Sequence, residues 1–264
     1  MNNYYVLITG SSKGFGRAMA LEFAHRNMNL FLVALPDSGL KELSVFIKTN
    51  FHVDVHYLEC DLSITDSFYT IKKFVQTKNI HLKHLVNNAG VLSRGFFHEL
   101  SDQYILKQIQ VNVIAPTLLT SVLLKNLKAN APASILNISS MASFFALPKK
   151  QVYCGTKSYL TSFSKSLGKE LKKDNISVTT FCPGSLNTTS RLCYQNRIVG
   201  WLTQKSVLNP EDAAKIAIDG MLRKQRLIVP GFVNKCLMVL DKLLPEFVKD
   251  YLALREIKKI HVIQ

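Results

Sequence analysis

The chain has 264 residues, 47% of them apolar, and a formal charge of +15. This size and composition suit one α/β domain with a full core, and they exclude a small fold held together by disulfides. No run reaches eighteen consecutive apolar residues, so we expect no membrane span. The segment MNNYYVLITG at 1–10 has neither a basic region nor a cleavage site, so we expect a cytoplasmic protein with reduced cysteines.

The positive charge is unevenly placed. From Gln103 to Pro210 the acids are Glu170 and Asp174, against thirteen lysines or arginines. Such a surface attracts anions, among them a phosphorylated cofactor, a thioester carrier or an anionic lipid face, although a merely solvated basic surface is an equal alternative. The sequence has no recognised nucleic-acid motif, and its five cysteines lack metal-binding spacing, so we expect neither nucleic acid nor metal as a ligand.

Short apolar runs alternate with helix-length segments along the chain. We predict strands in YYVLIT (4–9), LFLVAL (30–35), VDVHYLEC (53–60), LKHLVNN (82–88), SILNIS (134–139), SVTTFC (177–182) and RLIVP (226–230), with a first helix over about 14–27. Near-continuous apolar runs are typical of strands buried on both faces of a parallel sheet. We therefore predict an α/β fold, a Rossmann-type doubly wound parallel sheet of about seven strands with helices on both faces.

The first strand ends in the glycine-rich segment TGSSKGFG at 9–16. Gly10, Gly14 and Gly16 permit a tight turn and a close approach of the backbone to a ligand. A helix follows at once, and the free N–H groups at its start form an anion site suited to a pyrophosphate. The position of this turn, between the first strand and the first helix, indicates a dinucleotide site.

The segment VYCGTK at 152–157 places Tyr153 four residues before Lys157, so the two share one face of a helix. A fixed positive charge favours the phenolate and lowers the pKa of a tyrosine, which suits it to proton transfer near neutral pH. Tyr69 and Lys73 have the same spacing, and we assign that pair to a solvated helix face because no serine partner lies near it. The spacing alone therefore does not identify a site.

Five further motifs occur in order: CDL at 60–62, NNAG at 87–90, VNVIAP at 111–116, NISS at 137–140 and CPGSLNT at 182–188. Together with the glycine turn and the Tyr–Lys pair, they resemble the short-chain dehydrogenase/reductase superfamily over roughly residues 4–230. The resemblance implies one catalytic domain over 1–230, binding of a nicotinamide dinucleotide, and hydride transfer to or from a carbonyl carbon.

The resemblance also implies a catalytic tetrad. Tyr153 would exchange a proton with the substrate oxygen, and Lys157 would lower the pKa of that phenol and bind the nicotinamide ribose. Ser140, thirteen residues before Tyr153, would hold the substrate oxygen, and Asn112 would tie a water molecule to Lys157. We therefore predict an active enzyme.

Cofactor contacts are implied at the motif positions, with Asp61 at the adenine and with Leu186 and Thr188 at the carboxamide. The predicted cofactor-binding residues are Gly10, Ser11, Ser12, Lys13, Gly14, Phe15, Gly16, Asp61, Leu62, Asn88, Ala89, Gly90, Tyr153, Lys157, Pro183, Gly184, Leu186 and Thr188. Taken singly, Asp61 could be a neighbour of a helix start, and the residues at 87–88 and 183–188 could be ordinary turn formers. Their order and their places at strand ends favour the functional interpretation.

The end of the second predicted strand bears on cofactor choice. An NAD-specific member carries an acid there, whereas this chain has Ala34 and Leu35, with Asp37 two residues on. Lys13 stands where NADP-preferring relatives carry a base that pairs with the 2′-phosphate. Leu35 departs from the arginine that many such relatives have. We predict NADP(H) as the preferred cofactor, with NAD(H) as the alternative.

The substrate is predicted to be a hydrophobic carbonyl compound or alcohol, with an acyl thioester as one candidate. The loop at 189–208 carries Leu192, Tyr194, Ile198, Val199, Trp201 and Leu202, and FFALP at 144–148 is expected to face the same cleft. Alternatively, these side chains could simply pack within a lid over the cleft and not contact the substrate. The alternatives to a ketone reductase are an NAD-preferring alcohol or hydroxysteroid-type dehydrogenase and a non-catalytic dinucleotide-binding regulator. We expect a homo-oligomer, a dimer or tetramer, paired through helices near 101–129 and 150–173.

Residues 231–264 are predicted to form an amphipathic helical extension, divided into two helices at Pro245. The second helix has an apolar stripe through Phe247, Tyr251, Leu254 and Ile257. The extension could pack on the core or a second subunit, cover the substrate cleft, or lie on a membrane. Residues 232–264 are therefore a candidate for peripheral membrane contact.

Overall fold

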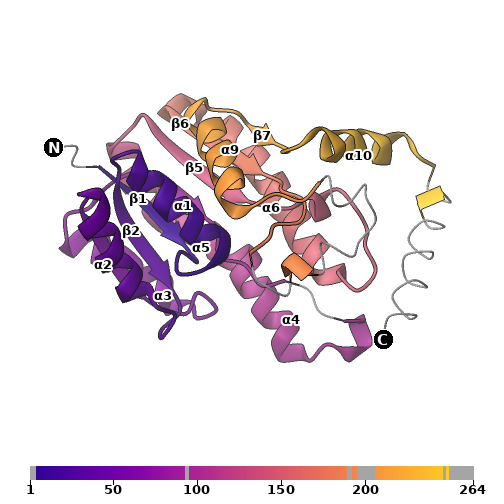
Figure 1. The fold of residues 1–264 in the computed structure, drawn as a ribbon, viewed down its shortest axis with the longest axis horizontal. Coiled ribbons are helices and arrows are strands. Elements are labelled where there is room, and N and C mark those ends of the chain that lie inside the picture. The colour runs from indigo at the N-terminus through magenta and orange to yellow at the C-terminus, as the bar shows by residue number, and fades with distance from the viewer. Residues whose placement is uncertain (1–3, 93–94, 189–191, 195–205, 246–247, 250–264) are drawn as a thin grey trace.

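The computed structural model describes residues 4–92, 95–188, 192–194, 206–245 and 248–249. Seven strands form one parallel sheet in the order β3-β2-β1-β4-β5-β6-β7 (Figure 1). The strands are β1 (Tyr4–Thr9), β2 (Asn29–Ala34), β3 (Val55–Glu59), β4 (His81–Asn87), β5 (Ala133–Ile138), β6 (Ile176–Phe181) and β7 (Leu227–Ile228). In β1, Val6 is paired with Leu30 on one side and with His84 on the other. The predicted Rossmann-type sheet is confirmed, and its strand order reverses between β1 and β4, the point where such folds bind ligands.

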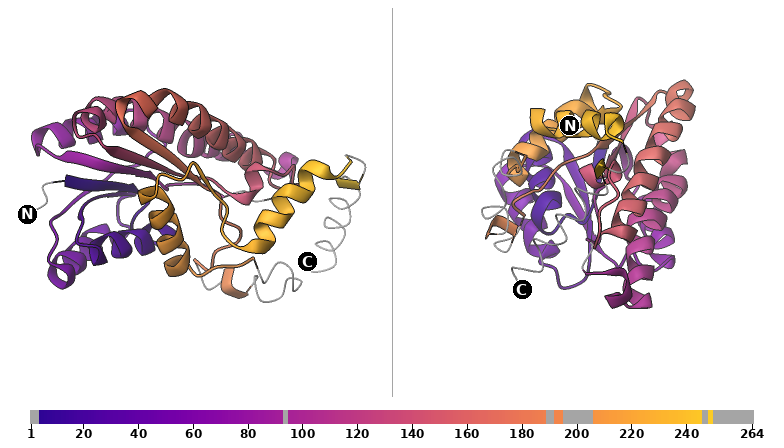
Figure 2. Two further views of the ribbon diagram at one scale, coloured as in Figure 1. Left: turned by 90° about the horizontal axis from the view of Figure 1, so that it is seen from above. Right: turned by 90° about the vertical axis from the view of Figure 1, so that its right-hand side faces the viewer.

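Helices cover both faces of the sheet, as Figure 2 shows. The α-helices are α1 (Gly14–His25), α2 (Leu40–Phe51), α3 (Asp66–Thr77), α4 (Asp102–Ile109), α5 (Ala115–Ala129), α6 (Gln151–Glu170), α9 (Pro210–Leu222) and α10 (Phe232–Leu243). The short helices are the 3₁₀ turns η1 (Phe97–Glu99), η3 (Met141–Ser143) and η4 (Leu171–Asp174), and the π-helical turn η2 (Gln110–Ile114). Helices α1, α2 and α9 contribute to one core cluster, and α3, α5 and α6 pack on the other face.

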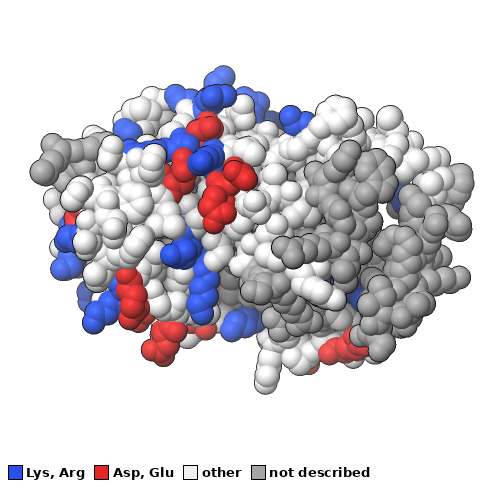
Figure 3. Space-filling view, viewed as in Figure 1, with Lys and Arg blue, Asp and Glu red and all other residues white. Residues whose placement is uncertain are grey.

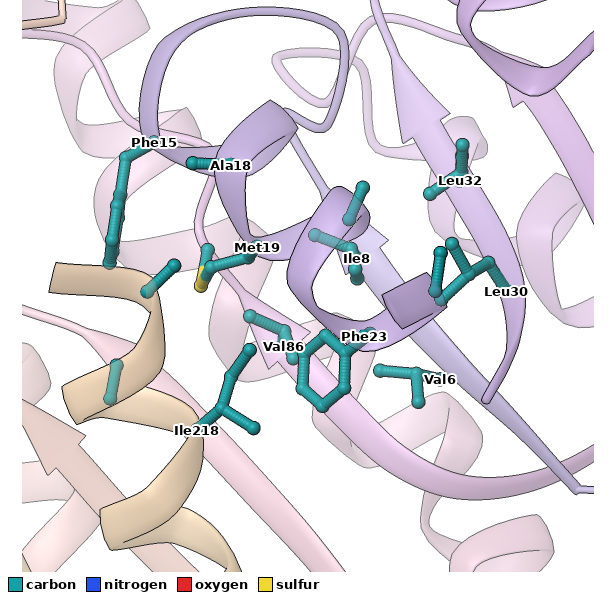
Figure 4. Close-up of a cluster of buried hydrophobic side chains, with 14 of the residues drawn as sticks. Val6, Ile8, Phe15, Ala18, Met19, Phe23, Leu30, Leu32, Val86 and Ile218 are labelled. Carbon is teal, nitrogen blue, oxygen red and sulfur yellow. The ribbon is translucent and has the colours of Figure 1, made fainter. Parts of the chain in front are cut away.

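Alternation along β1 divides the core between the two faces. Val6 and Ile8 point towards α1 and α9, whereas Tyr5 and Leu7 point towards α3 and α5. Figure 4 shows members of the first cluster, among them Val6 and Ile8 of β1, Phe23 of α1 and Ile218 of α9. Each fully buried side chain of this kind contributes roughly 1.5–3 kcal/mol to stability. These clusters fix the strand ends that carry the candidate site.

Three elements differ from their predicted bounds by two residues at one end or the other. Helix α1 ends at His25, because Asn27 has a φ of 58° and the chain leaves the helical path there. The strand predicted over 226–230 is paired at Leu227 and Ile228 only, at the edge of the sheet. β3 begins at Val55, because the carboxylate of Asp54 accepts a hydrogen bond from the Tyr5 hydroxyl and the side chain is turned to β1.

The C-terminal extension begins as predicted. Helix α10 ends at Leu243, ahead of Pro245. The stripe predicted for the second helix, at residues 247, 251, 254 and 257, lies outside the described residues. Among the residues that the structure describes, no helix is long and apolar enough to cross a membrane.

Candidate functional site

The turn between β1 and α1 requires glycine at three positions, Gly10, Gly14 and Gly16. Gly10 and Gly14 have φ angles of +64° and +54°, in the left-handed region that other residues avoid. A Cβ atom on Gly16 would lie 2.1 Å from the carbonyl oxygen of Gly10, too close for any side chain. A Cβ on Gly10 would lie 2.9 Å from Cα of Ala89. The turn therefore packs directly against the end of β4.

A hydrogen-bonded pair, Thr9 and Asn88, joins the ends of β1 and β4. The Thr9 hydroxyl accepts from the backbone N–H groups of Asn88 and Ala89, both at 3.0 Å. The Asn88 amide donates to the carbonyl oxygens of Thr9 at 2.8 Å and Gly10 at 3.2 Å. Asn88, predicted as a cofactor residue, thus holds the glycine turn through its side chain. Thr9 was missed, although its place before the first glycine was a usable signal.

The start of α1 suits an anion. Lys13 is the N-cap residue, is exposed, and makes no side-chain capping bond, so no capping side chain covers the first N–H groups of the helix. The Ser11 hydroxyl, in contrast, donates to the carbonyl oxygen of Val33 at 3.2 Å and is fully buried. The Phe15 ring is buried and stacks on Phe181 at 5.6 Å. Of these predicted cofactor residues, Ser11 and Phe15 turn their side chains into the protein, so only their backbone faces the turn.

Asp61 and Leu62 follow β3 and differ in environment. One carboxylate oxygen of Asp61 accepts from the backbone N–H and the hydroxyl of Ser63, both at 2.8 Å. Partial burial raises the pKa of Asp61, but these two bonds outweigh it and lower the pKa overall. The Leu62 side chain is buried in the core on the α3 face. The Asp61 carboxylate is thus held in a turn, and Leu62 contributes packing.

Ser140 and Tyr153 are brought together by β5 and α6. Ser140 caps the 3₁₀ turn after β5, where its hydroxyl accepts from the N–H of Ala142 at 3.1 Å. The same side chain lies near the phenol of Tyr153 in the first turn of α6. Burial raises the pKa of Tyr153, and the interaction with Ser140 lowers it by less. The net shift is upward, so the predicted lowering of this pKa was wrong for the protein alone.

Lys157 lies one helical turn beyond Tyr153 and is buried. Its ammonium donates to the carbonyl oxygen of Ile138 at 2.8 Å, at the end of β5. Its Nζ atom is 5.7 Å from the centroid of the Tyr153 ring. Burial lowers the pKa of Lys157 to about 8. The cation is thus held beside the phenol, where it favours a phenolate, while burial of the phenol sets the net upward shift of the Tyr153 pKa.

Asn112 lies in the π-helical turn η2 between α4 and α5, a local widening that recurs at functional sites. Its amide is fully engaged. The oxygen accepts from the N–H of Val91 at 2.8 Å, and the nitrogen donates to the carbonyl of Val91 at 2.9 Å and to the Thr156 hydroxyl at 3.1 Å. A Cβ on Gly90 would lie 3.5 Å from both Asn112 Oδ1 and Lys157 Nζ, so the two side chains flank Gly90.

Two further polar residues, missed from sequence, fix the backbone of Lys157. The Ser139 hydroxyl donates to the carbonyl oxygen of Lys157 at 3.0 Å and lies 2.8 Å from the Thr161 hydroxyl. Ser139 precedes the predicted Ser140, and Thr161 follows the predicted Lys157 by four residues, but nothing in their spacing distinguishes them from ordinary core serines and threonines. They tie α6 to the end of β5.

The segment after β6 returns to the glycine turn. A Cβ on Gly14 would lie 3.2 Å from Cβ of Thr188, so Thr188 lies over the start of α1. Leu186 forms an isolated parallel bridge with Leu208 and packs against the core on the α1 face. The backbone of Pro183 accepts from the N–H of Met141 at 2.9 Å, which joins this segment to the turn that follows Ser140.

A pocket of about 920 Å³ runs along the adjacent side of α6. It is lined by Ser143, Phe144, Phe145, Ala146, Leu147, Pro148, Gln151, Cys154, Gly155 and Ser158. The predicted segment 144–148 therefore does form an apolar wall, next to Tyr153 in sequence, but Ser140, Tyr153 and Lys157 are not among the lining residues. Of the predicted lid residues, Ile198, Val199, Trp201 and Leu202 lie outside the described residues.

Comparison with known proteins agrees with this geometry. A family model described as short chain dehydrogenase matches residues 4–195. Estradiol 17-beta-dehydrogenase 11 from Homo sapiens is 30% identical, over 91% of this chain and 79% of its own. Very-long-chain 3-oxoacyl-CoA reductase from Rattus norvegicus is 32% identical, over 68% of this chain and 58% of its own.

Among solved structures, a short-chain dehydrogenase from Sphingobium yanoikuyae in complex with NADPH superimposes with a TM-score of 0.77 and 26% identity. The match covers 87% of this chain and 88% of that one. The fold, the order of the strand-end motifs and the family match lead to one conclusion. The chain belongs to the short-chain dehydrogenase family of oxidoreductases.

Proposed function

We propose that this protein is an NADP(H)-dependent oxidoreductase that interconverts a ketone and a secondary alcohol on a hydrophobic substrate. The observation that carries the proposal is one cluster at the carboxyl end of β5. There the side chains of Ser140 and Tyr153 lie near each other and beside the buried ammonium of Lys157. A proton donor, a polar partner and a cation in one place are what carbonyl reduction requires.

The glycine turn fits a dinucleotide. Gly16 leaves no room for a Cβ, and the uncapped start of α1 supplies N–H groups for a pyrophosphate. When bound, the nicotinamide supplies or accepts the hydride. The chain's own contribution is to hold that cofactor through the turn at 10–16 and the segment at 183–188, and to manage the proton.

In the reductive direction, Tyr153 donates its phenolic proton to the substrate oxygen while Ser140 holds that oxygen. The raised pKa of Tyr153 keeps the phenol protonated at neutral pH, ready to act as the donor. The Lys157 cation stabilises the phenolate that forms after transfer. Asn112 acts as a positioning residue, because its amide is engaged with the backbone of Val91 and with Thr156.

The proposed preference for NADP(H) rests on the end of β2 and the start of α1. Leu35 is 48% exposed where NAD-specific enzymes have an acid, so no carboxylate of that position repels a 2′-phosphate. Lys13 is exposed beside the glycine turn and can pair with the phosphate. The structural neighbour in complex with NADPH is consistent with this choice.

The proposed substrate is large and apolar. Phe144, Phe145, Leu147 and Pro148 line the pocket along α6. The relatives named estradiol 17-beta-dehydrogenase 11 and very-long-chain 3-oxoacyl-CoA reductase support a steroid-like ketone or a long acyl thioester. The basic stretch between residues 103 and 210 would attract the phosphates of a thioester carrier.

A second candidate is an NAD-preferring hydroxysteroid-type dehydrogenase that works towards oxidation. It is favoured by the name of the human relative and by Asp37, two residues after Leu35. A non-catalytic regulator is less well supported, because a regulator has no need for the proton-handling groups at 140, 153 and 157.

We further propose residues 1–230 as the catalytic domain, 231–264 as an extension, and pairing of subunits through α5 and α6. The support for pairing is an aromatic face. Tyr159 is 40% exposed, stacks on Phe163 at 5.8 Å, and shares a hydrogen bond of 3.0 Å with Thr117 of α5. Exposed aromatic side chains of this kind are common in the centres of interfaces.

The test is consumption of NADPH and of NADH against steroid ketones, long-chain 3-oxoacyl thioesters, aldehydes and small diketones. We expect faster turnover with NADPH, on the steroid or acyl substrates, and loss of turnover in Ser140→Ala. If these reactions are absent, and the corresponding alcohols are instead oxidised with NAD⁺ and formation of NADH, the second candidate is favoured. Binding of NADPH with no turnover on any substrate would favour the regulator.

A further inference from the structure

Helix α10 presents an apolar face to the outside of the molecule. We call this face the outer stripe: Phe232, Cys236, Val239, Leu240 and Leu243. The spacing of 4, 3, 1 and 3 residues puts all five on one side of an α-helix. Phe232 is 81% exposed, Leu243 75%, Val239 51% and Leu240 48%. A row of large exposed side chains along one helix marks a contact surface.

The opposite side of α10 is already satisfied by the fold. Leu237 and Met238 pack against a cluster that contains Met141, Cys182 and Val229. The Asn234 amide is buried and donates to the carbonyl oxygen of Pro230 at 2.8 Å. The outer stripe is exposed because the opposite side of α10 is the one that packs on the fold. A partner can therefore cover the stripe without any rotation of the helix.

Charge is arranged to suit an anionic surface. Asp241 is the single acid in α10, and it lies on the side away from the outer stripe, paired with Lys249 at 3.8 Å. Lys235 is exposed next to the stripe. In Figure 3 few charged side chains appear at the upper right, where α10 lies (Figure 1). An apolar stripe with a lysine beside it and no carboxylate on it is the pattern of a helix that lies in a lipid interface.

Charge and the length of α10 indicate which kind of partner covers the outer stripe. Anionic headgroups complement the exposed Lys235 beside the outer stripe and the formal charge of +15 on the whole chain. The twelve residues of α10 extend only roughly 18 Å, which is too short to span a bilayer but long enough to lie along one. We propose that the outer stripe of α10 binds the surface of an anionic lipid bilayer.

This placement also bears on the pocket. Phe144 and Phe145 line the pocket along α6, and both pack against the same cluster as Leu237 and Met238 of α10. The side of α10 opposite the outer stripe therefore packs against the cluster that also holds two residues of the pocket wall. The lipid contact itself does not depend on the proposed reaction, because it is measured without cofactor or substrate.

The experiment is co-sedimentation of the full chain with phosphatidylglycerol-containing vesicles and with pure phosphatidylcholine vesicles. We expect binding to the anionic vesicles, weakened by salt, and a loss of at least ~10-fold in Phe232→Ser/Leu243→Ser. Lys235→Glu should weaken binding by ~5-fold or more at low salt. The matched control is Val45→Ser/Phe46→Ser, which removes two exposed side chains (59% and 47%) from α2 and should bind as the parent does.

Circular dichroism and light scattering accompany each variant. If the stripe variant folds and still binds vesicles as well as the α2 control, the proposal is wrong. It is also wrong if the parent chain ignores anionic vesicles, or if the stripe variant turns a dimer into a monomer with vesicle binding unchanged. The last outcome would identify a second copy as the occupant. Should the stripe variant misfold, Lys235→Glu carries the test, since an exposed lysine can be replaced without loss of packing.

Discussion

Helices α3 and α6 lie on the same face of the sheet, and each carries a tyrosine four residues before a lysine. In α3, Tyr69 is 56% exposed and Lys73 is exposed, with no part in any polar cluster that the structure describes. In α6, Tyr153 lies near Ser140, and Lys157 is buried against the end of β5. The spacing is identical, so the difference lies in the neighbours. Proton transfer needs the polar groups at the strand ends beside α6, whereas Tyr69 and Lys73 of α3 face solvent.

The largest effect should come from removing the buried cation. Lys157→Met should lower turnover by roughly 10²-fold or more, because the phenolate of Tyr153 loses the charge that stabilises it. The matched variant in α3, Lys73→Met, should leave turnover unchanged. Initial rates of NADPH consumption measure both. Equal rates in the two variants would contradict the assignment of α6 as the catalytic helix.

Two helical glycines extend the same comparison. Gly16→Ala places a Cβ 2.1 Å from the Gly10 carbonyl oxygen, whereas Gly155→Ala meets nothing within 4 Å. We expect Gly16→Ala to destabilise the protein by roughly 1–3 kcal/mol and to weaken NADPH binding. Gly155→Ala should be neutral or stabilising by up to about 1 kcal/mol, since alanine favours a helix. Urea unfolding and fluorescence titration of NADPH test the pair, and a stable, tightly binding Gly16→Ala protein would exclude the tight turn described here.

The pH dependence of stability separates Lys157 from Lys73. Because burial lowers the pKa of Lys157 from 10.5 to about 8, the unfolded chain binds a proton between these values that the folded chain lacks. This residue's contribution to the free energy of unfolding therefore rises with pH in that window, by up to about 1.4 kcal/mol per pH unit. The change in the free energy of unfolding between about pH 7.5 and about pH 10, measured with urea, should be more positive for Lys73→Met than for Lys157→Met. A gain of the same size in both variants would contradict burial of the cation.

The smallest effect concerns cofactor choice. Lys13→Ala should raise KM for NADPH by ~5-fold to ~10-fold, because an exposed ion pair with phosphate contributes about 1 kcal/mol. KM for NADH should not change, because that cofactor lacks the 2′-phosphate. The control is Lys72→Ala, an exposed lysine in the middle of α3. A parallel rise for both cofactors would assign Lys13 to general binding.

The strands were predictable because burial on both faces leaves a plain signal. β1, β2 and β5 are apolar almost throughout, and their bounds agree with the predicted runs to within a residue. β7 was predicted over five residues and pairs over two, because an edge strand has a partner on one side only and its length is set by that partner. The strand-end motifs were found by their order, since a glycine turn or an asparagine pair taken alone is common.

What the sequence could not give is the direction of the pKa shift on Tyr153. The spacing places Lys157 near Tyr153, but the Lys157 ammonium donates its hydrogen bond to the carbonyl oxygen of Ile138. Burial of the phenol then sets the direction of the Tyr153 pKa shift. Ser139 and Thr161 were missed for a related reason. Ser139 is hydrogen-bonded to the backbone of Lys157 and to the Thr161 hydroxyl, and both contacts depend on how β5 meets α6, which no local pattern records. The outer stripe of α10 follows from periodicity, but its exposure depends on which side of α10 is docked.

The central claim is that Tyr153 is the proton donor and that Tyr69, with the same spacing to a lysine, is not. The most direct measurement compares Tyr153→Phe with Tyr69→Phe in NADPH consumption against the best ketone of the substrate panel. We expect loss of turnover in Tyr153→Phe with NADPH binding retained, and parental turnover in Tyr69→Phe. Undiminished turnover in Tyr153→Phe would contradict it.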